Sequence, residues 1–349
     1  MKKTVMYVED CNNGAILVKD VINSYGAVVV AKNTMINPYI KSKLISWGIE
    51  HICIYEPSTD PQEDNSSNKI IQLQFKYRNN IDLYKEFICG LAEGRKLDTE
   101  KLAGLSDFVI KNIDETDDII HILDKVKTTD EYTHTHCLNV SFYAMLIGKW
   151  LKLSASDIKK LVSAGLLHDI GKMQIPLPIL NKPGKLLPEE FEVIKQHPLN
   201  GYTILNRLGI FDNDVVSAVL CHHEREDGTG YPLKIKSEEI NLYSKIIAIA
   251  DVYDAITSER IYKPKATPFT AFKIFNKEFF NSLDLTIIGT FLKNLATFYI
   301  GSKVVLNSGS IGEIAFIPPN NIAEPIIRIE DTFYDLAKER DLEITSIVS

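Results

Sequence analysis

The most informative residues of this sequence are two pairs of metal-binding side chains, His168-Asp169 and His222-His223. Neutral imidazole and carboxylate are ligands that suit Fe, Mn, Ni, Co or Zn, and a shared aspartate is a usual bridge between two such ions. The second pair stands directly before a loop with glycines at positions 228 and 230. Two such pairs predict a metal site, and a hydrolase is the leading functional hypothesis.

Three further residues strengthen the prediction of a metal site. His136 lies on a predicted helix from about residue 132 to 151, and His197 lies at the edge of a later predicted helix. Asp251 follows the apolar run of residues 246–250, where a carboxylate costs free energy unless a cation or hydrogen bonds compensate it. A lone His-Asp pair would be explained by a helix-capping acid beside a surface histidine, but these additional candidates disfavour that alternative.

A predicted helix from residue 157 to 167 positions the first pair. Its apolar residues cover one side, and Gly171 is expected to let the chain turn after His168-Asp169. Both side chains would then project from a rigid helical end, as a preorganised metal site requires.

The spacing of apolar residues predicts a mainly α fold, a helical bundle with two small β-rich parts. The period is helical from about residue 69 to Phe298. Predicted strands lie at residues 15–18, 27–31, 51–55, 302–306, 312–316 and 326–329, and a short helix at 38–47. The predicted parts are an N-terminal module (1–56), a linker of Pro, Ser and acids (57–68), connecting helices (69–115), a catalytic domain (116–300) and a C-terminal β appendage (301–349).

Composition excludes some classes of partner and location. The chain has 349 residues, 45% of them hydrophobic, and a net charge of −7, which argues against DNA as a partner. The five cysteines form no CxxC pair, which favours a reducing cytoplasm. No signal peptide and no apolar run long enough to span a membrane is recognisable, so we expect a soluble cytoplasmic protein.

Several ordered motifs between residues 116 and 300 resemble one family, the HD-GYP phosphohydrolases of bacterial cyclic di-GMP signalling. The matching segments are Leu166-Leu167-His168-Asp169-Ile170-Gly171-Lys172, Leu180-Asn181-Lys182-Pro183-Gly184-Lys185-Leu186, Lys195-Gln196-His197-Pro198, His222-His223-Glu224-Arg225, Asp227-Gly228-Thr229-Gly230-Tyr231-Pro232 and Ala250-Asp251-Val252-Tyr253-Asp254-Ala255-Ile256-Thr257-Ser258.

The resemblance implies two divalent transition metal ions, with Fe or Mn favoured over Ni, Co or Zn. One ion would be held by His136, His168, Asp169 and Asp251. The other would be held by His197, His222 and His223, with Asp169 as the bridge.

The resemblance also implies roles beside the metals. Lys172 matches a lysine that contacts the scissile phosphate or a bridging hydroxide, so Asp169 and Lys172 are the candidate catalytic residues. Arg260 and Lys263 match residues that grip substrate phosphates. Tyr231 either stacks on guanine or pins its loop.

Asp254 is interpreted either as a group that orients a ligating histidine or contacts Lys172, or as an acid on a helix surface. The 228–232 loop could also contact a GGDEF-domain or other protein, and a homodimer is possible.

One departure from the family concerns a third metal. Trinuclear members carry a Glu four residues before the first histidine, and Tyr132 stands there in this chain. The adjacent Glu131 is rotated by about 100° on a helix. His134 lies two residues from His136, so it points to a different side. A binuclear centre is therefore predicted.

The activity implied is hydrolysis of cyclic di-GMP to pGpG, with further cleavage to GMP left open. One alternative is an HD hydrolase of another nucleotide. The other is a receptor that binds cyclic di-GMP or a partner protein without turnover. The N-terminal module briefly suggests a response-regulator receiver, but it lacks an aspartate after a third strand, and it looks instead like a small β-rich module found ahead of such catalytic domains.

Overall fold

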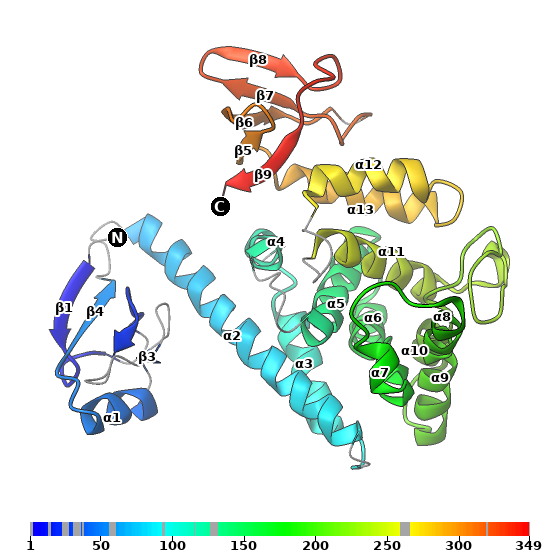
Figure 1. Ribbon diagram of the computed structural model, residues 1–349, viewed down its shortest axis with the longest axis horizontal. Coiled ribbons are helices and arrows are strands. Elements are labelled where there is room, and N and C mark those ends of the chain that lie inside the picture. The colour runs from blue at the N-terminus through cyan, green and yellow to red at the C-terminus, as the bar shows by residue number, and fades with distance from the viewer. Residues whose placement is uncertain are drawn as a thin grey trace. The chain divides into compact units, whose positions relative to one another are not determined.

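The computed structural model describes residues 3–12, 15–22, 28–30, 36, 38–55, 61–92, 95–114, 116–125, 132–258, 266–318 and 320–348, and the statements below concern these residues. The chain divides into two compact units, Met1–Asn80 and Ile81–Ser349. Each unit is described by itself (Figure 1).

The first unit contains two small antiparallel sheets and one helix. Strand β1 (Lys3–Tyr7) pairs with β4 (His51–Tyr55), and β2 (Val21–Ile22) pairs with β3 (Val28–Val30). Helix α1 spans Pro38–Ser46. Leu17, Ile36 and Leu44 are fully buried in its core.

The predicted helix and the strands at 51–55 and 27–31 correspond to α1, β4 and the shorter β3. The predicted strand at 15–18 is only partly formed. Ile16 and Leu17 are in isolated β-bridges, Leu17 with Ile54, and the Val18 N–H donates to the Cys53 carbonyl at 2.9 Å.

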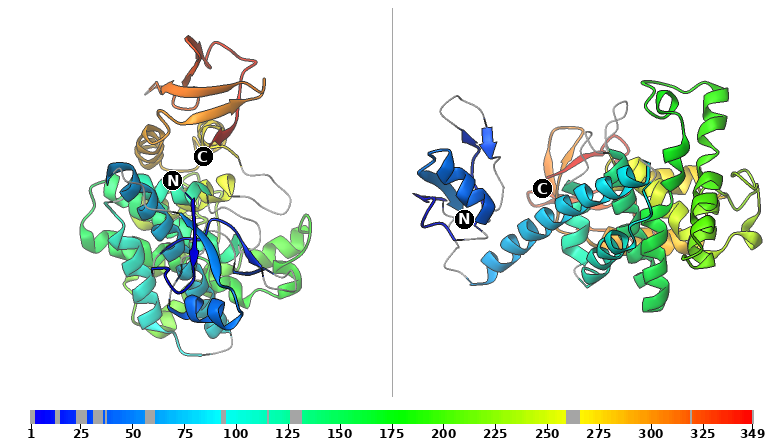
Figure 2. Two further views of the ribbon diagram at one scale, coloured as in Figure 1. Left: turned by 90° about the vertical axis from the view of Figure 1, so that its left-hand side faces the viewer. Right: turned by 90° about the horizontal axis from the view of Figure 1, so that it is seen from below.

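Helix α2 (Pro61–Ala92) occupies part of the segment for which a linker is predicted. Figures 1 and 2 show it as one unbroken helix. Residues 57–60 lie outside the described residues, and residues 61–68 are helical. The polar composition indicates exposure, which a helix tolerates as well as a linker does. Proline at the first helical position with acids close behind is typical of a helix start.

The second unit is a helical bundle, which confirms the mainly α fold. Its helices are α3 (Thr99–Lys111), α4 (Thr116–Lys125), α5 (Tyr132–Trp150), α6 (Ala155–Leu167), α7 (Leu177–Leu180), α8 (Pro188–Ile194), α9 (His197–Leu208), α10 (Asn213–Cys221), α11 (Leu242–Thr257), α12 (Pro268–Glu278) and α13 (Leu285–Thr297), with 3₁₀ turns η2 (Ile170–Gln174) and η3 (Ser237–Glu239).

Helix α5 is the central element of this bundle. It packs against α6, α11 and α13, and its residues 135–148 are all buried. A helix that is buried on every side needs apolar residues all round, as in the run from Cys137 to Ile147. The polar residues Thr135, Asn139 and Ser141 of this helix are buried as well.

The C-terminal part of the second unit is one antiparallel sheet with strand order β8-β7-β6-β5-β9. Its strands are β5 (Lys303–Leu306), β6 (Ile311–Phe316), β7 (Ile326–Ile329), β8 (Thr332–Asp335) and β9 (Ile344–Val348). The first three agree with the predicted strands. The last two are edge strands with one buried residue between them, Ile344, so their hydrophobic alternation is too weak to indicate strands.

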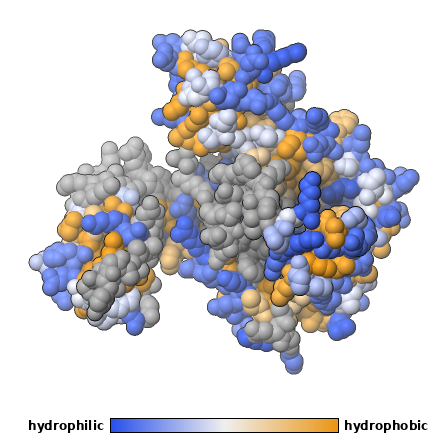
Figure 3. Space-filling model, viewed as in Figure 1, coloured by the Kyte–Doolittle hydropathy of each residue, from blue (hydrophilic) through white to orange (hydrophobic). Residues whose placement is uncertain are grey.

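Apolar and hydrophilic side chains are interspersed on the face of the second unit that Figure 3 shows. Among the described residues, no helix combines the length and the apolar character that crossing a membrane requires.

Candidate metal centre

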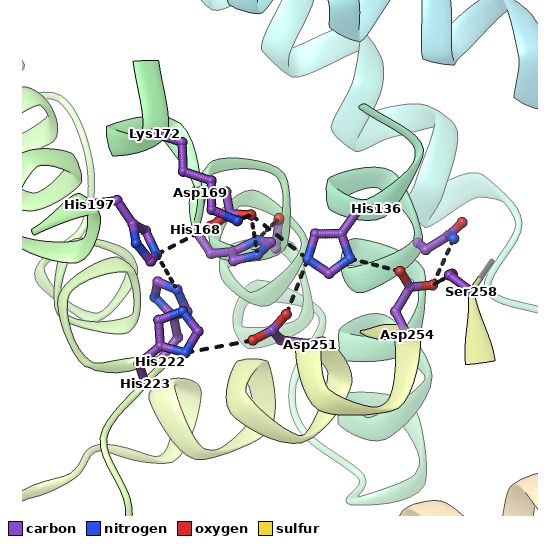
Figure 4. A network of polar contacts seen from close by, with 12 residues as sticks. His136, His168, Asp169, Lys172, His197, His222, His223, Asp251, Asp254 and Ser258 are labelled. Carbon is purple, nitrogen blue, oxygen red and sulfur yellow. Dashed lines mark hydrogen bonds and ion pairs between the residues drawn. The ribbon is translucent and has the colours of Figure 1, made fainter. Parts of the chain in front are cut away.

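Seven side chains that the sequence singles out as ligands converge at one place in the bundle (Figure 4). They come from α5, the end of α6, the start of α9, the end of α10 and α11. These residues are His136, His168, Asp169, His197, His222, His223 and Asp251. All lie in the interior or nearly so, and the five elements converge through the packing of the bundle.

The seven residues form two groups of potential ligands. The ligating atoms of His136, His168 and Asp251 lie within 4.8 Å of one another, and those of His197, His222 and His223 do so as well. These are the two triads that the resemblance predicts for two separate ions.

Asp169 lies between the two groups. Its Oδ2 is 3.4 Å from His168 Nε2 and 3.8 Å from His136 Nε2. Its Oδ1 is 3.3 Å from His197 Nε2. One carboxylate oxygen therefore faces each group, which is the arrangement that a bridging ligand needs.

The backbone fixes the orientation of three of the histidine rings. The Nδ1 atoms of His168, His197 and His222 each lie 2.8 Å from the carbonyl oxygen three residues earlier. A carbonyl only accepts hydrogen bonds, so these contacts assign the ring proton to Nδ1. Each Nε2 then presents a lone pair to the centre, as a ligating histidine does.

The same hydrogen bonds leave several buried polar atoms in need of a cation. His197 Nε2 and His222 Nε2 lie 3.2 Å apart, and neither carries a proton to share if both protons are on Nδ1. His168 Nε2 and Asp169 Oδ1 are buried without a hydrogen-bond partner among the described residues. Opposed lone pairs and an unpaired buried carboxylate oxygen are unfavourable. The donor set therefore fits divalent metal ions.

Asp254 supports the fourth histidine. Its Oδ2 accepts a hydrogen bond from His136 Nδ1 at 2.7 Å. Its Oδ1 accepts from Asn139 Nδ2 at 2.8 Å and from Ser258 Oγ at 3.0 Å. Asp254 is fully buried, so the alternative of an acid on the helix surface is wrong. No sequence motif indicated the partners Asn139 and Ser258, although Asn139 lies three residues after His136, on the same side of a helix.

The electrostatics favour the protonation states that metal ligands require. Burial lowers the pKa of His197 to about 4 and that of His223 to about 3. Burial alone would raise the pKa of Asp169 and Asp251, but Lys172 beside Asp169 and the hydrogen bond from His136 to Asp251 hold both pKa values well below the usual range. Neutral imidazoles and ionised carboxylates bind metal ions without first losing protons.

His136 is the exception among the imidazoles. Burial lowers its pKa, but hydrogen bonds to Asp251 and Asp254 outweigh burial and raise the pKa to about 9. The Nε2 atom of His136 lies 3.1 Å from Asp251 Oδ1, so a proton is shared there. A metal ion held by these two residues would take the place of that proton.

Lys172 lies directly at the bridging carboxylate. Its Nζ is 2.5 Å from Asp169 Oδ2, and its side chain is 28% exposed.

The residue before Lys172, Gly171, permits a close approach between η2 and α9. A Cβ atom at Gly171 would lie 1.9 Å from the carbonyl oxygen of His197. Gly171 therefore allows His197 to lie next to Asp169. This role goes beyond the chain turn predicted for Gly171.

Cys137 also lies close to the centre. It is buried, and its Sγ lies within 4.8 Å of ligating atoms of His168 and Asp169. Burial and the charge of Asp169 raise the pKa of the Cys137 thiol. The thiolate is the form that binds metals, so the raised pKa disfavours Cys137 as a ligand.

Tyr231 packs against a ligand. Its ring stacks on the ring of His223 with centroids 4.7 Å apart and an angle of 28° between the planes. The centroids of the Phe191 and Tyr231 rings are 6.5 Å apart, and Lys195 Nζ lies 6.0 Å from the Tyr231 centroid. This packing supports a role in holding the loop and His223.

Glu224 organises the loop that carries Tyr231, a role that the sequence motifs did not indicate. Its buried Oε1 accepts hydrogen bonds from the backbone N–H groups of Leu233 at 2.6 Å and Lys234 at 3.1 Å. Gly230 lies so close that an added Cβ would be 2.4 Å from Glu224 Cα. The position of Glu224 directly after His222 and His223 could have indicated this role, because an acid next to buried residues needs hydrogen-bond donors.

The remaining predicted residues lie outside the described part of the chain. Arg260 and Lys263 are not described, and neither is Glu131. The backbone of α5 is described from Tyr132, but the side chains of Tyr132 and His134 are not.

Comparisons with known proteins agree with this geometry. The sequence model of the HD domain family matches residues 120–287. A cyclic di-GMP phosphodiesterase of Pseudomonas aeruginosa is 35% identical over 236 residues, which cover 68% of this chain and 57% of that protein. The chain belongs to the HD-GYP family.

Other HD-GYP comparisons bear on specificity and fold. A 3'3'-cGAMP-specific phosphodiesterase of Vibrio cholerae is 36% identical over 159 residues, covering 46% of this chain and 34% of that protein. The chain thus spans 57% of the length of the first relative and 34% of the second. A solved HDG"Y"P protein from Bdellovibrio bacteriovorus superposes with a TM-score of 0.54 at 15% identity, over 84% of this chain and 99% of that one. This last likeness supports the fold alone.

Proposed function

We propose that this protein is a metal-dependent phosphodiesterase that hydrolyses cyclic di-GMP to pGpG. The observation that carries the proposal is the convergence of the two histidine-containing triads on Asp169, with buried lone pairs directed to the centre. The substrate is proposed from the similar Pseudomonas protein, which is a cyclic di-GMP phosphodiesterase.

We further propose that the centre holds two divalent ions, Fe or Mn in preference to Ni, Co or Zn. His136, His168 and Asp251 would hold one ion, and the other triad the second, with Asp169 bridging. Mixed imidazole and carboxylate ligands suit these metals. Such ions would lower the pKa of a water molecule to produce a nucleophile and would neutralise charge on phosphoryl oxygens.

Side chains of the protein would support this chemistry in distinct ways. Lys172 keeps Asp169 ionised through their 2.5 Å contact, and its exposed part is available to a phosphate. Tyr231 would hold His223 in its ligating orientation through ring stacking. Arg260 and Lys263 remain proposed phosphate ligands on the ground of the family motif.

A second candidate function is hydrolysis of 3'3'-cGAMP, because a relative of comparable identity is specific for that nucleotide. A receptor without turnover is disfavoured, because both triads and the bridging carboxylate are complete. Partner binding by the 228–232 loop, dimerisation and a cytoplasmic location also remain proposals. The proposed catalytic domain is residues 116–300.

The deciding experiment is hydrolysis of both cyclic dinucleotides by anaerobically purified protein whose metal content has been measured. We expect pGpG from cyclic di-GMP at a higher kcat/KM than cleavage of 3'3'-cGAMP. The reverse preference would assign the second function. Binding of cyclic di-GMP without product in a single-turnover assay of fully metallated protein would establish a receptor.

A further inference from the structure

Arg225 is a cation beside the metal centre for which the proposed mechanism has no role. It follows the ligand His223 and Glu224 directly in the chain. The loop fixes its backbone, because Gly228 N–H donates to the Arg225 carbonyl at 2.8 Å. A Cβ atom at Gly230 would lie 2.4 Å from Arg225 N, which shows how tightly the loop closes over this residue. The side chain therefore starts from a rigid position, two residues after His223 and three after His222.

The guanidinium group of Arg225 has donors to spare. Its Nη1 donates to the carbonyl oxygen of Glu224 at 3.0 Å, and guanidinium offers five N–H donors. Among the described residues, no carboxylate forms an ion pair with Arg225, although its side chain is partly buried. Two lysines near the centre, by contrast, have carboxylate partners: Lys172 pairs with Asp169, and Lys195 pairs with Glu192.

Arg225 belongs to the loop on one side of the centre. This loop is joined to His223, because the Tyr231 N–H donates to the His223 carbonyl at 3.2 Å and the Tyr231 ring stacks on the His223 ring. Figure 4 places His223 and Asp251 on the side of the cluster opposite Lys172. Within the described ranges, Arg225 is thus a cation without an ion-pair partner, in the loop on the His223 side of the centre, whereas Lys172 lies on the other side.

A partly buried cation without an anionic partner is unfavourable unless a ligand supplies the anion. Guanidinium matches a phosphate in charge and in the fork geometry of its donors. We propose that Arg225 binds a non-bridging oxygen of the phosphodiester that reacts at the metal centre. This inference rests on the proposed function for its substrate class, and it adds a substrate-binding residue on the His223 side.

The test uses the full chain loaded with Mn²⁺ and inorganic phosphate as the probe. Arg225→Gln removes the charge, Arg225→Lys keeps it without the fork, and Lys195→Gln is the matched control, a nearby cation that already has a carboxylate partner. Calorimetric titration gives the phosphate affinity, and elemental analysis gives the metal content. Loss of a charged hydrogen bond predicts that Arg225→Gln binds phosphate on the order of ten- to a hundred-fold more weakly, with unchanged metal content.

Arg225→Lys should fall between the wild-type protein and Arg225→Gln, and Lys195→Gln should bind phosphate like the wild-type protein. Undiminished phosphate affinity in Arg225→Gln would overturn the inference, and so would a loss of metal that accounts for the weaker binding. The generic diester bis(4-nitrophenyl) phosphate separates this outcome from failure of the proposed function. If the wild-type protein hydrolyses that diester but not cyclic di-GMP, the proposed substrate is wrong, and the phosphate titration still decides the role of Arg225.

Discussion

The carboxylate beneath His136 offers the sharpest test of the metal centre. Asp254 accepts from His136 Nδ1 through one oxygen and from Asn139 and Ser258 through the other, at 2.7, 2.8 and 3.0 Å. In Asp254→Asn, one oxygen becomes an NH₂ group that cannot accept. If that group faces His136, the ring proton must move to Nε2, the atom that faces Asp251. If it faces Asn139, two NH₂ groups oppose each other in a buried site.

The size of the effect follows from these two arrangements. Loss of the partner that orients a ligating histidine costs about 10- to 100-fold in metal affinity, which corresponds to about 1.4–2.8 kcal/mol. An unpaired buried polar group costs about 1–3 kcal/mol of unfolding free energy. Ser258→Ala is the matched control, because it removes one donor to Asp254 and leaves the contact with His136 intact. It should lower stability slightly and leave metal affinity unchanged.

The assay is a titration of metal-free protein with Mn²⁺, with urea unfolding as the measure of stability. We expect Asp254→Asn to retain one binding event of wild-type affinity and to weaken the other by the factor given above. Wild-type affinity for both ions in Asp254→Asn would refute the reasoning that the Nδ1 contact sets the proton position on His136.

Three further predictions concern metal content and pH. Asp169→Ala should abolish hydrolysis and remove most of the bound metal, because one bridging carboxylate serves both triads; full metal content with retained activity would contradict the bridge. Tyr132→Glu should raise the metal content from about two ions per chain toward three, because a phenol with a pKa near 10 is a poor ligand at neutral pH; three firmly bound ions in the wild-type protein would show the binuclear prediction to be wrong. Metal-free protein should lose stability as the pH falls from about 6.5 to about 4. In this range the histidines of the unfolded chain bind protons, whereas His197 and His223 stay neutral in the folded state because their pKa values are about 4 and 3. His136, with its raised pKa of about 9, contributes stability that is lost only above pH 6.5, so unfolding free energies that do not fall between pH 6.5 and 4 would count against these pKa values.

The residue types were enough to predict a metal site, because imidazole and carboxylate in an apolar context have few other uses. The proposed ligand set came from the resemblance to the HD-GYP family. The arrangement of the ligands was not predictable in the same way. The position of Asp169 between the triads depends on the packing of η2 against α9, which are distant in the sequence. Gly171 permits this close packing. The partners of Asp254 come from α5 and from the end of α11, so no local pattern joins them.

Similar reasons explain the errors in the fold. Residues 61–68 have the composition of a linker, and the structure places them in the first turns of α2. The strands β8 and β9 are stabilised by pairing with β7 and β5, and their own sequences bury too little to show a period of two. The ring of Tyr231 suits a base or a neighbouring side chain, and the stacking on His223 is a tertiary contact that no local pattern indicates.

The carbonyl acceptors of three ligating histidines limit how this centre can change during evolution. Every residue type has a backbone carbonyl, so no ordinary substitution at position 165, 194 or 219 removes the acceptor of His168, His197 or His222. Their proton positions are therefore protected from side-chain mutation. Only His136 relies on a replaceable side chain, Asp254. Among these four histidines, that contact is the one through which a side-chain substitution can move the ring proton without exchanging a proposed ligand.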